Sequence, residues 1–280
     1  MATISNVNGK KITKIKYKGE IYDTGGSGVN PLQHIIDNHK GDGQPSGEDL
    51  FYEYWGSSLD DAINSCDFSG ITSAFQMFYD CKNLTSIPYF NTSNCTDMSY
   101  MFQNCAKLTT IPQLDTSKVT DMKSMFNSCS DLITIPQLNT SSVTAMNSMF
   151  WKCSNLTTIP LLDTSKVTSM ISMFSQCSKL TTIDITHMNI TETSNNNYFA
   201  QKCYSLTKLI IRNMPTIPTL SSYAFQQCVH FTGTVEATYN PQGLKDGRIY
   251  VPDDKVEALK AATNWSVYAD IIVPLSTLVE

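Results

Sequence analysis

The stretch from residue 115 to residue 132 reads Asp-Thr-Ser-Lys-Val-Thr-Asp-Met-Lys-Ser-Met-Phe-Asn-Ser-Cys-Ser-Asp-Leu, and its pattern returns along the chain every 24 residues. Met-Phe pairs stand at 77–78, 101–102, 125–126, 149–150 and 173–174. Three other columns keep the same register: Cys81, Cys105, Cys129, Cys153 and Cys177; Leu84, Leu108, Leu132, Leu156 and Leu180; Ile87, Ile111, Ile135, Ile159 and Ile183. Units in phase predict one repeat array rather than separate globular domains.

Two further units are expected at a looser spacing, at Tyr198-Phe199 with Cys203 and at Ala224-Phe225 with Cys228. Within one unit, four apolar residues have the i, i+3, i+4, i+7 spacing of a helix face: Met122, Met125, Phe126 and Cys129. Residues 132–135 form a short β-prone run before Pro136.

Such a unit cannot bury its apolar face alone, so neighbouring units must stack. We therefore expect an α/β repeat solenoid of 24-residue units, each a short strand plus a short helix, capped at both ends.

The motif of residues 115–132 resembles the repeat of BspA-like leucine-rich-repeat surface proteins of bacteria, in the variant DTSxVTxMxxMFxxCxxL. The later segment Ala224-Phe225-Gln226-Gln227-Cys228 resembles the AFxxC form of the same superfamily. The resemblance covers about residues 66–230. It implies a leucine-rich-repeat solenoid used for adhesion or partner binding, without enzymatic activity, in a family that is usually exported by a signal peptide.

The ends differ from the repeats, and four regions are predicted. Residues 1–28 comprise a hairpin around Asn8-Gly9 and a Gly/Ser linker at 25–28, and residues 29–65 form an N-terminal cap. The solenoid spans 66–230 and a C-terminal cap spans 231–280. In that cap we expect strands at 231–235 and 248–251, and a helix that begins with a capping-box pair, Asp254 and Glu257.

Composition excludes several classes of function. Charged residues make up 16% of the 280-residue chain and the net charge is -5, which provides no basic surface for nucleic acid. No apolar run has the roughly 18 residues that a membrane helix needs, and the first ten residues lack the apolar core of a signal peptide. We expect no membrane insertion and a location that is extracellular, at a cell surface or on a virion.

The nine cysteines follow the repeat, which argues against a disulfide framework. Seven occupy the Cys column, Cys66 aligns with a leucine column and Cys95 with a valine column. Cysteines in register on stacked units have nearly parallel Cβ vectors about 4.8 Å apart, which is too far for a disulfide. All nine are interpreted as small buried residues.

Catalytic and metal-binding chemistry has no pattern in this chain. The four histidines are scattered over the cap, the insertion and the final unit: His34, His39, His187 and His230. They form no triad and no metal-ligand spacing with the cysteines. The sequence predicts a protein that is not an enzyme and has no cofactor and no metal.

Columns that vary between units mark the expected solvent-facing surface. The candidate binding residues are Trp151 and Tyr79 after Met-Phe, Tyr100 where later units have Ser, and Tyr89, Gln113, Gln137 and Leu161 after Pro. Exposed aromatic residues are effective anchors for a partner, whereas scattered surface aromatics often have no function. The leading hypothesis is an adhesion module for a protein or glycan, and the alternative is a spacer whose N-terminal element makes the contacts.

Overall fold

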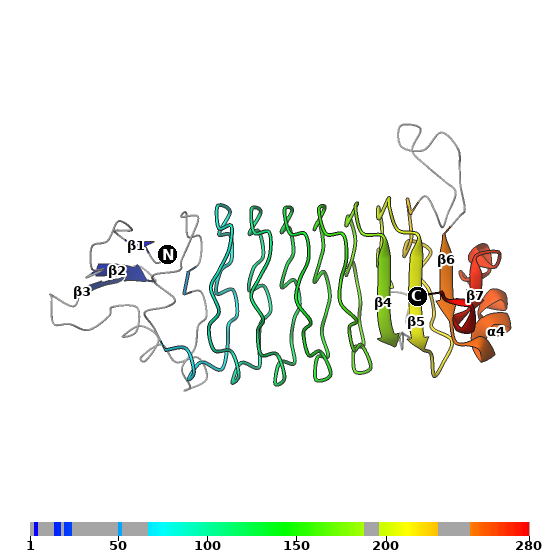
Figure 1. Cartoon of the computed structure of the whole chain (residues 1–280), viewed down its shortest axis with the longest axis horizontal. Coiled ribbons are helices and arrows are strands. Elements are labelled where there is room, and N and C mark those ends of the chain that lie inside the picture. The colour runs from blue at the N-terminus through cyan, green and yellow to red at the C-terminus, as the bar shows by residue number, and fades with distance from the viewer. Residues whose placement is uncertain are drawn as a thin grey trace.

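The computed structural model describes residues 3–4, 14–17, 20–23, 50–51, 67–187, 196–228 and 247–279. A four-stranded parallel sheet runs in the order β4 (Thr182–His187), β5 (Lys208–Asn213), β6 (Arg248–Val251) and β7 (Ile272–Pro274). The described part of the chain contains one α-helix, α4 (Val256–Ala261). A parallel sheet with few helices is compatible with a repeat-type α/β fold (Figure 1).

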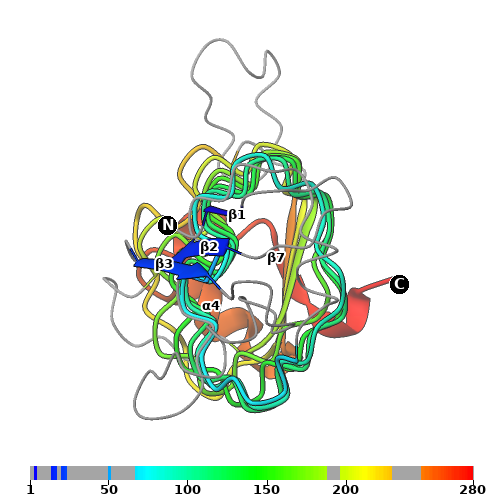
Figure 2. The same cartoon turned by 90° about the vertical axis from the view of Figure 1, so that its left-hand side faces the viewer.

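Backbone hydrogen bonds join each repeat unit to both of its neighbours. The N–H of Thr120 donates to the carbonyl of Thr96 in the unit before (2.8 Å), and the N–H of Met122 donates to that of Ala145 in the unit after (3.0 Å). Isolated parallel bridges continue this pairing from Ser73 to Ser169. Seen along the long axis, the successive turns overlay on one closed outline (Figure 2).

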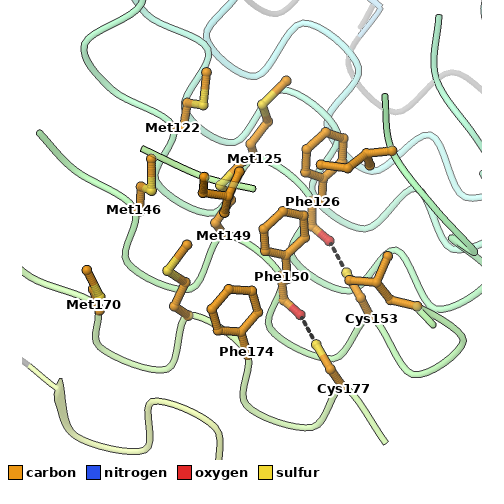
Figure 3. Close-up of a cluster of buried hydrophobic side chains, with 14 of the residues drawn as sticks. Met122, Met125, Phe126, Met146, Met149, Phe150, Cys153, Met170, Phe174 and Cys177 are labelled. Carbon is orange, nitrogen blue, oxygen red and sulfur yellow. Dashed lines mark hydrogen bonds between the residues drawn. The ribbon is translucent and has the colours of Figure 1, made fainter. Parts of the chain in front are cut away.

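The core is a set of side-chain columns that run through these units (Figure 3). Phenylalanine rings stack face to face at centroid distances of 5.2–5.6 Å and angles of 4–9°, in the order Phe51, Phe78, Phe102, Phe126, Phe150 and Phe174. Two methionine columns lie beside them and are fully buried from Met98 to Met173. The repeat columns read from the sequence are therefore the core.

The short helix predicted in each unit is wrong. Residues 122–129 form consecutive reverse turns, in which Ser124 and Ser128 have φ values of 53° and 61°. Their N–H groups donate to the carbonyls of Asn147 and Trp151 in the next unit (2.9 and 2.7 Å). An α-helix would direct these groups to carbonyls four residues earlier in the same unit, so pairing between units replaces the helix.

The predicted short strand forms only in the later units, and proline explains the difference. Residues 132–135 and their equivalents precede Pro88, Pro112, Pro136 or Pro160 and are not strands. Proline has no N–H to donate to a neighbouring strand. Asp184 takes this position in the next unit and pairs with Ile210, and there β4 and β5 form.

The cysteines are reduced and buried, as predicted, for all eight that the structure describes. Each thiol of the Cys column also donates to a carbonyl in the preceding unit; Cys129 Sγ lies 3.0 Å from the Phe102 oxygen, and Cys153 Sγ lies 3.0 Å from the Phe126 oxygen. The column thus supplies one further bond per unit. Cys66 lies outside the described residues.

One predicted unit is shifted by one residue. The Cys203 N–H donates to the Ala200 carbonyl, as Cys177 does to Phe174, so Ala200 and not Phe199 occupies the phenylalanine column. Phe199 fills the methionine column instead, and its ring meets that of Phe174 at 88°. Tyr198 consequently lies two residues before the phenylalanine column, at the surface, and 38% of it is exposed.

Three short strands lie near the N-terminus, and the predicted turn at Asn8-Gly9 lies outside the described residues. β1 (Thr3–Ile4) pairs antiparallel with β2 (Lys14–Tyr17), which pairs with β3 (Glu20–Asp23). The Gly/Ser linker lies outside the described residues, as does the predicted cap 29–65 apart from 50–51.

The last unit is covered by residues after β6, whose predicted bounds are confirmed. Trp265 packs against Phe225 and donates from Nε1 to the Pro218 carbonyl (2.8 Å). Tyr268 and Ile271 are also buried there. The strand expected at 231–235 lies outside the described residues.

The predicted capping box at the start of α4 is wrong. A 3-10 helix, Asp253–Lys255, precedes α4, and Lys255 is an N-cap without a side-chain hydrogen bond. Asp253 Oδ1 instead accepts the N–H of Ser276, which tethers the C-terminal segment. Two more 3-10 helices, Ser266–Tyr268 and Leu275–Thr277, flank β7.

Candidate functional site

The residues that directly follow the prolines of successive units line a groove of about 610 Å³ on the repeat surface. Four predicted residues meet in it: Tyr89, Gln113, Gln137 and Leu161. Tyr89 is 63% exposed and Leu161 is 38% exposed, so both offer apolar area to a partner. The groove continues over successive units and is therefore a product of the repeat.

Tight turns at the Asp/Asn column form one wall of the groove. Asp115 Oδ1 accepts the N–H and hydroxyl of Ser117 (3.0 and 2.7 Å), and Asn139 Oδ1 accepts those of Ser141 (3.1 and 2.8 Å). The Ser117 N–H and hydroxyl hold the pKa of Asp115 below its usual value. This carboxylate is charged at neutral pH, and its side chain is fixed by its own turn.

The wall continues at Asp163, whose Oδ1 accepts the Ser165 N–H (2.9 Å) and the Thr186 hydroxyl (3.1 Å). The Ser165 hydroxyl, followed by its N–H, lowers the pKa of Asp163. The groove therefore has two negative charges, and none of its lining residues is Lys, Arg or His.

The two glutamines form a ladder along the groove. Gln113 Nε2 donates to the carbonyl of Gln137 (2.7 Å), and Gln137 Nε2 donates to the carbonyl of Leu161 (2.9 Å). Each amide group thus bridges to the next unit and is held in one orientation. A partner that binds here does not have to immobilise these side chains.

Threonines beneath the turns link the same units, with one exception. Thr116 Oγ1 donates to the carbonyl of Asn139 (2.9 Å), and Thr164 Oγ1 donates to that of His187 (2.6 Å). Thr140 lines the groove between them and is 2% exposed, yet its Oγ1 has no hydrogen-bond partner. The groove wall therefore contains one buried hydroxyl that the chain leaves unsatisfied.

A family comparison supplies the identity of the repeat. Residues 47–134 and 132–238 match the family model described as "Mycoplasma protein of unknown function, DUF285", and the two matches span more than half of the chain. The protein belongs to the DUF285 family. DUF285 is a repeat family of the BspA-like group, in agreement with the resemblance in the sequence motif. A comparison with curated proteins found no match.

The other three predicted residues of the DUF285 chain lie away from the groove. Trp151 is half-buried, and the Nζ of Lys152 lies 4.1 Å from its ring centroid. Tyr100 is half-buried between Phe75 (ring centroids 5.7 Å apart) and Lys123. Tyr79 is also half-buried. A binding role for either set of residues stays a prediction.

Two exposed tyrosines of the DUF285 repeats escaped the sequence reasoning. Tyr198 and Tyr223 lie on adjacent units with ring centroids 5.5 Å apart, and Tyr223 is 49% exposed. Both occupy the position of Tyr100, and the carbonyl of each of these tyrosines accepts the N–H of the residue three positions later. Alignment of the units on phenylalanine misplaces Tyr198 by one residue, and alignment on cysteine puts both tyrosines at this position.

Within the described ranges, no three His, Cys, Asp or Glu side chains cluster as metal ligands would. The imidazole of His187 lies between the Thr186 hydroxyl (Nδ1, 2.9 Å) and the Asn213 amide (Nε2, 2.7 Å). His34, His39 and His230 lie outside the described residues. None of the helices in the described segments is long and apolar enough to cross a bilayer.

Proposed function

We propose that this DUF285 protein is a non-enzymatic binding or adhesion module. It is a leucine-rich-repeat solenoid, capped at both ends, that presents a rigid surface to a protein or glycan partner. Its place is extracellular, on a bacterial cell surface or a phage particle. The observation that carries this proposal is the groove that successive units build from exposed Tyr89 and Leu161 and the glutamine ladder.

Rigidity supports binding as the role of this surface. The side chains of Asp115, Asn139 and Gln113 in the groove are held by hydrogen bonds to their own turns or to the adjacent unit. Binding to a surface already ordered loses less conformational entropy than binding to mobile side chains. The stacked core beneath fixes the spacing between units, so the whole surface acts as one body.

The test is a binding screen of the full chain against extracellular host proteins and a glycan array. For a partner that binds, Tyr89→Ala combined with Leu161→Ala is expected to weaken binding at least about tenfold, which corresponds to about 1.4 kcal/mol. The pair Tyr79→Ala and Trp151→Ala tests the other predicted column in the same way.

A version that lacks residues 1–28 provides the comparison with the spacer alternative. The module proposal expects this version to bind as the full chain does. Loss of binding on this deletion, with both alanine pairs unaffected, would establish a spacer instead. Unchanged thermal unfolding is the folding control for each version.

A further inference from the structure

We propose that the groove binds a neutral, extended polysaccharide that runs along the stack, with one sugar residue per repeat unit. This inference rests on the proposed binding function and specifies its ligand. It follows from the charge, the side-chain chemistry and the periodicity of the groove.

The charge of the lining favours a neutral ligand over an anionic one. Asp115 and Asp163 are the charged side chains of the lining, and both are carboxylates fixed by serine turns. The lining itself contains no Lys, Arg or His, so a phosphate, sulfate or uronate would meet two carboxylates there, and the nearby cations Lys118 and His187 lie outside the lining. A neutral ligand with many hydroxyls meets no such penalty, because carboxylates accept hydrogen bonds from hydroxyl groups.

The lining also has the chemistry that sugars need. Carboxylate, amide and hydroxyl groups alternate along it, in Asp115, Ser117, Asn139 and Ser141. They accept and donate hydrogen bonds and are already oriented. Tyr89 adds an aromatic ring, 63% exposed, on which the apolar face of a sugar ring can pack.

Periodicity favours a polysaccharide over a peptide. Adjacent units advance by about the 5.2–5.6 Å that separates stacked phenylalanine rings of the core. An extended peptide advances about 3.3 Å per residue and turns alternate side chains away, so it runs out of phase with the units. The residue length of an extended β-linked polysaccharide is close to the advance of one unit. Each sugar can therefore lie against the equivalent position of one unit.

The experiment measures binding of the full chain to linear neutral oligosaccharides of two to six residues, a sulfated oligosaccharide and a lysine-rich peptide. We expect affinity for at least one neutral sugar series to rise about tenfold or more with chain length, and no binding of the sulfated probe. Tyr89→Ala should weaken that binding about tenfold. Tyr223→Ala, an exposed tyrosine away from the groove, should leave it unchanged.

Asp115→Asn combined with Asp163→Asn separates sugar from peptide. This pair should change sugar binding less than about threefold, since the amide still hydrogen-bonds, but it should abolish binding of a cationic peptide. If the chain binds the lysine-rich peptide but no sugar, and the Asp→Asn pair abolishes that binding, the inference is overturned and the proposed binding function remains. A protein partner bound through Tyr89 when all neutral sugars fail has the same meaning. Absence of any partner overturns both.

Discussion

Replacement of Phe126 by alanine is expected to lower the free energy of unfolding by about 3–5 kcal/mol. Phe126 is fully buried, and its ring stacks between those of Phe102 and Phe150 at 5.6 Å on either side. The cavity would lie within the stacked phenylalanine column, between the rings of Phe102 and Phe150. The substitution therefore weakens both interfaces of its unit.

Urea unfolding followed by tryptophan fluorescence and circular dichroism measures this loss. Phe75→Ala is the matched control, because Phe75 is half-buried and outside the stacked column. We expect it to cost clearly less. Equal losses for the two substitutions would mean that the phenylalanine column is not the shared core.

Stability is expected to fall steeply above about pH 8.5, where thiols of the unfolded chain ionise. Burial raises the pKa of Cys95 to about 12 and raises the pKa values of five thiols of the Cys column: Cys105, Cys129, Cys153, Cys177 and Cys203. Above pH 8.5 the unfolded chain loses these protons and the folded chain keeps them. The unfolded state is therefore favoured, by about 8 kcal/mol per pH unit for six thiols.

Urea midpoints between pH 7 and pH 10 measure this dependence. Cys129→Ser removes one titrating group and should reduce the slope by about 1.4 kcal/mol per pH unit. A midpoint that stays constant up to pH 10 would contradict a buried thiol column.

The repeat made the core columns and the variable columns predictable from sequence. Columns fixed through the five units in phase, such as those of Phe126 and Cys129, are used in packing, and this holds whatever backbone lies between. The column that follows the proline column varies between units, so packing does not require a particular side chain there. Tyr89, Gln113 and Gln137 were found in this way, and they lie together because units stack in register.

The local backbone could not be predicted in the same way. Consecutive reverse turns bury Met122, Met125 and Phe126 with the spacing that one helix face also gives. Only the hydrogen bonds to the next unit distinguish the two conformations. The strand depended on a single residue, since Asp184 in place of proline allows β4 to pair.

The hydrogen-bond network of the groove was also beyond the sequence. The threonine column looks uniform in sequence, but Thr116 and Thr164 donate to carbonyls whereas the Thr140 hydroxyl has no partner. Likewise, Asp254 and Glu257 have capping-box spacing, yet Asp253 makes the contact because Ser276 approaches from the C-terminal segment.

The whole account depends on successive units sharing one buried core, and a count of reactive thiols tests this most directly. In native protein at pH 8, we expect none of the eight cysteines that the structure describes to react, because all eight are buried. In denaturant, all nine should react. Three or more reactive thiols in the native protein, or disulfides formed in it by mild oxidation, would contradict the stacked column.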